Sequence, residues 1–231
     1  MPSAESRSRH VPPATVARLP VYHRALLTLA QRGERTVSSA ELSVVTGVTA
    51  PTVRRDLSHL GSFGTRGTGY AVSQLLARVD RALGIDREWP VVVVGIGSLG
   101  RALARSGNFS ARGLKVVALL DIDPQVVGSA VGGVAVEHVD RLEAVVKREE
   151  AAIAVLATPP GAAQSLADRL AAAGVRAILN LAPVVLRPAL GVRVGTVDLA
   201  AELQVLAFYG ARTEGPARTV TGAGRRRRQS S

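Results

Sequence analysis

Apolar side chains in the first part of the chain follow a helical period. Between Thr15 and Gly33 they recur at spacings of three and four, which is the pattern of a helix that buries one face. Ser38 and Glu41 stand three residues apart and form the signature of a capping box, in which each side chain accepts a hydrogen bond from the backbone of the other. They predict a second helix that ends at Gly47.

A third helix follows and completes a helix-turn-helix. It is expected to begin at the cap Thr49 and to stop at Gly61. The segment 61–70 places four glycines around Arg66 and predicts the hairpin of a winged helix-turn-helix domain. A helical stretch over 72–83 then leads toward a second domain.

From residue 91 onward, short apolar runs alternate with helical stretches. Such alternation is typical of an α/β fold in which parallel strands are joined by right-handed helical crossovers. We expect strands at 91–95, 115–121, 152–157, 177–181 and 192–196, and helices at 99–106, 139–148, 162–173 and 198–209. The second domain is therefore predicted to be a Rossmann-type parallel-sheet domain.

A glycine motif of the form G-x-G-x-x-G lies where the first of these strands meets its helix. Gly95 is expected to make the tight turn, Gly97 to let a pyrophosphate approach the backbone, and Gly100 to let the helix pack closely on the sheet. Asp121 ends the second strand, where a carboxylate accepts hydrogen bonds from an adenosine ribose diol and repels a 2′-phosphate. This order predicts a dinucleotide site that favours NAD(H) over NADP(H).

Alternatives remain open at these positions. A glycine-rich turn without a ligand is one, and a cap of the turn into Pro124 by Asp121 or Asp123 is another. The loops after the third and fourth strands are expected either to flank the nicotinamide ring or to be ordinary turns. The predicted cofactor contacts from the loops are Gly95, Ile96, Gly97, Ser98, Leu99, Gly100, Asp121, Thr158, Pro159 and Asn180.

The third helix of the first domain carries the candidate DNA contacts. Arg54, Arg55, Ser58 and His59 project from the face opposite to its apolar positions. Arginine binds guanine bidentately or holds phosphates, and Arg66 on the wing is placed to enter a minor groove. The alternative is a charged face that contacts only solvent.

Charge and composition narrow the possible functions. The net charge is +11, with 12 basic and 7 acidic side chains in residues 1–89 and five basic and no acidic ones in residues 215–231. The excess of positive charge at both ends suits contact with phosphates. The alternative is a basic surface that only aids solubility. The chain has no cysteine and its four histidines show no ligand spacing, so we expect no metal.

The same data favour a cytoplasmic binding protein. No apolar run approaches the roughly 20 residues that span a bilayer. Residues 1–13 lack the apolar stretch of a signal peptide, so we expect no membrane contact. The second domain also lacks a good candidate for the general acid or base of a dehydrogenase, which argues for binding rather than catalysis.

The expected domain organisation has four parts. Residues 1–14 are predicted to be a disordered segment and 15–85 the winged-helix domain. Residues 86–211 are predicted to be the Rossmann domain with its last helix, and 212–231 a disordered basic tail. The tail includes Arg225–Arg228, which either adds phosphate contacts or is dispensable.

The chain resembles the redox-sensing transcriptional repressors of the Rex family. The resemblance lies in segments 15–22, 53–58, 61–70, 95–100, 121–124, 162–164, 178–184 and 197–199. It implies a homodimer in which the last helix swaps into the partner and brings Asp198 and Leu199 close to the partner's nicotinamide. It also implies a switch in which Arg24 pairs with Asp198 across the dimer in one of two states.

Three positions depart from the family pattern. Ser106 replaces a tyrosine that contacts the same aspartate in the other state, which puts that half of the switch in doubt. His59 stands where a tyrosine is common and Ser98 where an asparagine is common.

The resemblance implies a repressor that senses the NADH/NAD⁺ balance. NADH would close the dimer and release it from a palindromic operator in double-stranded DNA, whereas NAD⁺ would permit binding. The alternatives are an NAD-dependent oxidoreductase with an appended DNA-binding domain, a repressor that senses another nucleotide such as a CoA ester, and a purely structural DNA-binding protein.

Overall fold

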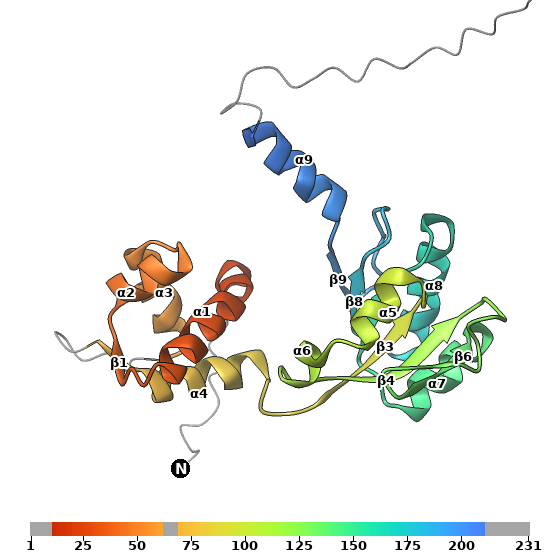
Figure 1. The fold of residues 1–231 in the computed structure, drawn as a ribbon, viewed down its shortest axis with the longest axis horizontal. Coiled ribbons are helices and arrows are strands. Elements are labelled where there is room, and N and C mark those ends of the chain that lie inside the picture. The colour runs from red at the N-terminus through yellow and green to blue at the C-terminus, as the bar shows by residue number, and fades with distance from the viewer. Residues whose placement is uncertain (1–10, 62–68, 211–231) are drawn as a thin grey trace, which may run out of the picture. The chain divides into compact units, whose positions relative to one another are not determined.

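The computed structural model describes residues 11–61 and 69–210, and the chain forms two compact units. The first comprises Met1–Pro90 together with Ser106–Val116, and the second comprises Val91–Arg105 together with Val117–Ser231. The chain therefore passes between the units three times, and a short segment from the middle of the sequence packs with the N-terminal unit. Figure 1 shows the elements of both units along the chain.

The first unit is the predicted winged helix-turn-helix. Its elements are α1 (Pro13–Gln31), β1 (Thr36–Val37), α2 (Ser39–Thr46), α3 (Ala50–His59), β2 (Tyr70–Ala71) and α4 (Val72–Leu83), with β1 and β2 antiparallel. The capping box is confirmed, because the backbone N–H of Glu41 donates to Ser38 Oγ over 3.1 Å and that of Ser38 donates to Glu41 Oε2 over 2.7 Å. The tip of the wing, including Arg66, lies outside the described residues.

The helices of this unit pack around one apolar core. Tyr22 and Leu26 of α1, Leu57 of α3 and Leu75 of α4 are fully or almost fully buried in it. At the wing, Gly69 has a φ of +82°, and a side chain there would press on the carbonyl oxygen of Val37 at 2.6 Å. A glycine is therefore required where β1 meets β2.

A buried carboxylate ties α3 to α1. Asp56 on α3 is 1% exposed and accepts hydrogen bonds from Arg18 Nε at 2.6 Å and Nη2 at 2.7 Å, from Tyr22 Oη at 2.6 Å and from Thr15 Oγ1 at 2.8 Å. Burial by itself raises the pKa of Asp56, but the hydrogen bonds from Arg18, Tyr22 and Thr15 outweigh it and lower the pKa to about 2. Every donor comes from α1, so the orientation of α3 on α1 depends on this carboxylate.

The second unit is built on a seven-stranded sheet in the order β5-β6-β4-β3-β7-β8-β9. The strands are β3 (Trp89–Val94), β4 (Leu114–Asp121), β5 (Ala130–Val131), β6 (Val134–His138), β7 (Ile153–Leu156), β8 (Ala177–Asn180) and β9 (Arg193–Thr196). β3 and β7, β7 and β8, and β8 and β9 pair in parallel, as predicted, and β4 pairs in parallel with β6. Sequence reasoning missed β5 and β6, an antiparallel pair of short strands turned by Gly132 and Gly133.

Helices connect these strands. They are α5 (Ser98–Ala104), the 3₁₀ turn η1 (Val139–Arg141), α7 (Leu142–Arg148) and α8 (Pro160–Ala173), while α6 (Gly107–Ser110), between β3 and β4 in the sequence, belongs to the first unit. The helix predicted at 139–148 is thus divided into η1 and α7, because the chain turns directly after β6. The apolar faces of α7 and α8 share one core with the central strands.

The last helix, α9 (Leu199–Gly210), has no buried residue. Its exposed side chains include Leu199, Leu203, Leu206, Phe208 and Tyr209, each more than half exposed. A helix this apolar is unusual on a protein surface and needs cover. The swapped position remains a prediction, since the structure holds a single chain.

We expect Asp56→Asn to lower the free energy of unfolding of the first unit by about 3 kcal/mol at pH 7, because it leaves the Arg18 guanidinium without its carboxylate. The folded-state pKa of Asp56 is depressed, so its contribution is fully present above pH 4 and is lost as the pH falls toward 2. The difference in free energy of unfolding between wild type and Asp56→Asn should therefore shrink as the pH falls from 4 to 2.

The measurement is urea unfolding followed by the fluorescence of Trp89, the single tryptophan of the chain, which begins β3 but belongs to the first unit. Glu34→Gln, which removes an exposed carboxylate from the same unit, is the control. A difference that stays constant from pH 7 to pH 2 would contradict this account.

Candidate nucleotide-binding and DNA-binding sites

The glycine loop joins β3 to α5 at the carboxyl edge of the sheet. Gly95 has a φ of +92°, and a side chain there would overlap the carbonyl oxygen of Ala157 after β7. A side chain at Gly100 would in turn overlap the carbonyl oxygen of Gly95. Both glycines are therefore required by the protein itself, for the turn and for close packing.

Gly97 is different. Its φ of −72° and ψ of −162° are open to any residue, and an added Cβ would meet no protein atom within 4 Å. The fold therefore does not require a glycine here. A ligand that lies against the backbone is the physical reason for one, because a side chain would occupy the space of the ligand.

Asp121 anchors the glycine loop to the end of β4. Its Oδ2 accepts from the backbone N–H of Ile96 at 2.5 Å, and its Oδ1 accepts from that of Asp123 at 2.9 Å. The side chain of Asp123 caps the following turn through the N–H of Gln125 at 2.9 Å, in line with the alternative considered for it. A carboxylate has about four acceptor sites, so Asp121 keeps capacity for a ribose diol.

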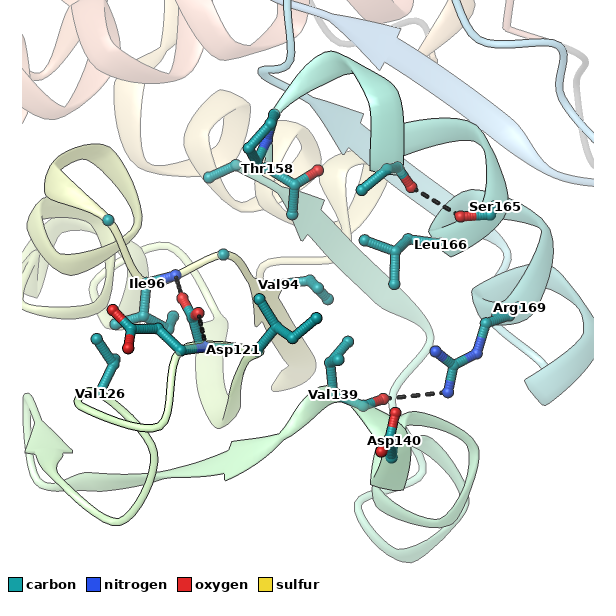
Figure 2. A pocket seen from close by; sticks show the side chains of 17 residues that line it. Val94, Ile96, Asp121, Val126, Val139, Asp140, Thr158, Ser165, Leu166 and Arg169 are labelled. Carbon is teal, nitrogen blue, oxygen red and sulfur yellow. Dashed lines mark hydrogen bonds between the residues drawn. The ribbon is translucent and has the colours of Figure 1, made fainter.

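These loops surround a cavity of about 750 Å³, which is the size of a pocket for a cofactor (Figure 2). The predicted residues that it brings together are Gly95, Ile96, Gly97, Asp121, Thr158 and Pro159. Thr158 Oγ1 is buried and has no hydrogen-bond partner among the described residues. A polar group of this kind on a pocket wall is typical of a site that contacts a ligand.

Sequence reasoning missed several other residues that line this pocket. They are Ile122, Val126, Val139, Asp140, Ala162, Ser165, Leu166 and Arg169. Ile122 was within reach of prediction, since it directly follows Asp121 at a strand end. Val139 and Asp140 follow β6, a strand that was not predicted, and Arg169 lies on α8 far along the chain.

Other predicted contacts do not line this pocket in the single chain. They are Ser98, Leu99, Gly100, Asn180, Asp198 and Leu199. The buried amide of Asn180 shapes its own loop, donating to the carbonyl of Val184 at 2.7 Å and accepting from the N–H of Ala182 at 3.0 Å. Asp198 caps α9 through the N–H groups of Ala200 and Ala201. Their contacts with a cofactor stay predictions.

The predicted DNA-contacting face of α3 is exposed. Arg54, Arg55 and Ser58 face solvent and His59 is half-buried, whereas Asp56 of the same helix is buried. Arg54 also donates to Ser39 Oγ of α2 at 2.9 Å, so this arginine links the two helices of the helix-turn-helix.

Comparison with known proteins identifies the family. Two family models match, one described as "CoA binding domain" over residues 86–184 and one as "Putative DNA-binding protein N-terminus" over residues 10–58. The redox-sensing transcriptional repressor Rex of Streptomyces coelicolor is 51% identical over 94% of this chain and 84% of its own. That of Roseiflexus sp. is 41% identical over 92% of this chain and 96% of its own. The chain belongs to the Rex family of redox-sensing transcriptional repressors.

Solved structures support the same family assignment. A crystal structure of RSP in complex with β-NAD⁺ and operator DNA matches with a TM-score of 0.83 at 34% identity, over 88% of this chain and 94% of the other. A structure of RSP, named there a Rex-family repressor, matches with a TM-score of 0.81 at 33% identity, over 88% and 95%. The Rex family members named here are repressors rather than enzymes, as expected for this chain.

Two further findings concern the described residues alone. Among residues 11–61 and 69–210, no group of three or more His, Asp or Glu side chains is arranged to hold a metal ion. Within the same ranges, no helix is long and apolar enough to cross a membrane.

Gly95 and Gly97 should respond differently to substitution by alanine. Gly95→Ala is expected to lower the free energy of unfolding by about 2 kcal/mol or more, because its Cβ overlaps Ala157 and its φ is positive. Gly97→Ala should change it by less than about 1 kcal/mol, because the backbone conformation is open to alanine and the added Cβ meets no protein atom. Chemical unfolding followed by far-UV circular dichroism measures both, and equal losses would contradict the geometry.

Proposed function

We propose that this Rex family member binds NADH and NAD⁺ in the second unit and operator DNA through α3, and that NADH binding releases the DNA. The observation that carries the proposal is Gly97, a glycine that the fold does not need and that lines the pocket. Asp121 beside it supplies the acceptor for a ribose diol. The RSP structures with β-NADH and with β-NAD⁺ and operator DNA support the same assignment.

The residues present fit a dinucleotide. The backbone at Gly97 is open to a pyrophosphate, and Asp121 has acceptor capacity for the adenosine ribose. Thr158 offers a hydroxyl without a partner among the described residues. The nicotinamide supplies the redox signal when bound. The pocket residues bind and orient it, and none of them has to move a proton for sensing.

Asp121 also favours NAD(H) over competing nucleotides. Its carboxylate repels a phosphate on the adenosine ribose, which both NADP(H) and coenzyme A carry. The name of the matching family model, CoA binding domain, therefore describes the fold, whereas the charge of Asp121 favours a free ribose diol.

Discrimination between NADH and NAD⁺ requires a difference in affinity between two states of the protein. In the proposed homodimer, α9 lies in the partner and places Leu199 beside the nicotinamide. The neutral ring of NADH is less costly to hold against an apolar side chain than the cationic ring of NAD⁺. A shift of the dimer from 1:99 to 99:1 needs about 5.5 kcal/mol of such a difference.

The exposed apolar surface of α9 supports this homodimer, since a second copy gives the cover that a single chain lacks. Asp198 at the start of α9 is already oriented by its capping bonds and is proposed to pair with the exposed Arg24 across the dimer in one of its two states. Ser106 directly precedes α6, and its short side chain has no ring to replace the contact of the family tyrosine.

The DNA-binding part of the proposal rests on α3. Arg55 and Ser58 are exposed on it, and Asp56 on its opposite face fixes its orientation. In a dimer, two such helices reach successive major grooves of a palindromic operator. We place this function in the cytoplasm, where both DNA and the NADH pool are found in a bacterium.

The first test is the fluorescence anisotropy of a labelled palindromic operator-like duplex at fixed salt. We expect NADH to release the duplex from the wild-type protein and NAD⁺ alone to have little effect. Gly97→Ala should still bind DNA but no longer respond to NADH, since its Cβ blocks the phosphates. Arg55→Ala, the matched control, should lose DNA affinity and keep NADH affinity. DNA binding that ignores both cofactors would contradict the proposal.

A second variant tests the swapped helix. Leu199→Asp should weaken NADH binding about tenfold or more, because it brings a carboxylate against an apolar ring site, and should leave operator affinity close to wild type. Titration of NADH fluorescence and operator anisotropy report the two affinities. Leu190→Asp, at a fully exposed position, is the control. Equal loss of both affinities for Leu199→Asp would exclude this role.

A further inference from the structure

Arg169 is the cation on the wall of the cofactor pocket that sequence reasoning did not find. It lies on α8 and bonds to Glu143 of α7 through Nε at 2.7 Å and Nη2 at 2.9 Å. Its Nη2 also donates to the carbonyl of Val139 at 3.1 Å. These bonds fix the plane of the guanidinium group, because a bidentate pair leaves it no rotation.

The position of Arg169 places it at one end of the site. In the proposed function the glycine loop takes the pyrophosphate and Asp121 takes the adenosine ribose. Figure 2 shows Arg169 across the pocket from Ile96 and directed toward Val139, with Leu166 near it. Asp140 and Ser165 also line this end of the pocket, where the apolar side chains of Val139 and Leu166 suit a flat aromatic base and the carboxylate of Asp140 disfavours a third phosphate.

The carboxylate of Glu143 balances the positive charge of Arg169. The hydrogen bond from Arg169 lowers the pKa of Glu143 to about 2, so the pair stays ionised at neutral pH. The Nε and Nη2 donors are used, whereas Nη1 has no hydrogen-bond partner among the described residues. A planar, ion-paired guanidinium with one free edge is a suitable surface for stacking and for donation to a ring nitrogen.

We propose that Arg169, held by Glu143, contacts the adenine base of the dinucleotide and contributes to its affinity. This inference rests on the proposed function and names a contact within that site. Glu143 acts as a positioning residue, since it sets the plane of the guanidinium without lining the pocket itself.

The test uses the full chain and two ligands, NADH and ADP-ribose, which share the adenosine diphosphate half and differ in the nicotinamide. Arg169→Met keeps a long side chain but removes the guanidinium. We expect this substitution to lower the affinity for both ligands by the same factor, about tenfold, because the contact lies in the half that the ligands share. Leu199→Asp, at the proposed nicotinamide end, should weaken NADH and leave ADP-ribose unchanged.

A merely structural role for the ion pair predicts a different result. Glu143→Gln breaks the same link between α7 and α8 but keeps the guanidinium in the pocket. If Arg169 contacts the base, Glu143→Gln should lose clearly less ADP-ribose affinity than Arg169→Met at similar thermal stability. Equal losses in the two variants, or unchanged ADP-ribose affinity in Arg169→Met, would overturn the inference and leave the proposed function intact. A wild-type protein that binds neither ligand would overturn both.

Discussion

The hydrogen bond between Asp121 and the backbone of Ile96 is the constraint on which the proposed cofactor site depends. It fastens the glycine loop after β3 to the end of β4, while Gly95 presses against Ala157 after β7. Because these strands are neighbours in one sheet, their ends meet at a single edge. One carboxylate and one glycine turn therefore close one side of the pocket and leave the backbone at Gly97 open.

The DNA-binding unit is likewise held together by a carboxylate that accepts several hydrogen bonds. Asp56 gathers three side chains of α1 as Asp121 gathers two backbone N–H groups, and each carboxylate joins segments that are distant in the sequence. Buried or half-buried carboxylates are costly unless they are fully hydrogen-bonded, so each holds its surroundings in one arrangement. In the first unit that arrangement directs the exposed face of α3 outward.

The apolar surface of α9 connects the fold to the proposed dimer. A single chain leaves this helix without a buried residue, although its composition is that of a core helix. In the proposed dimer the second copy covers α9, so the free energy of burying this helix is available only to the dimer.

The sequence by itself determined the two domains, the helix-turn-helix, the parallel sheet and the glycine motif, because helical periods, caps and glycine turns are local signals. It did not show β5 and β6, which are short and depend on pairing with each other, nor the division of η1 from α7. Only the tertiary structure decided that Arg169 joins the pocket, that Asn180 bonds within its own loop, and that Gly97 alone among the three motif glycines faces open space. These are contacts between residues far apart in the chain or between a side chain and a backbone turn, and no spacing along the sequence encodes them.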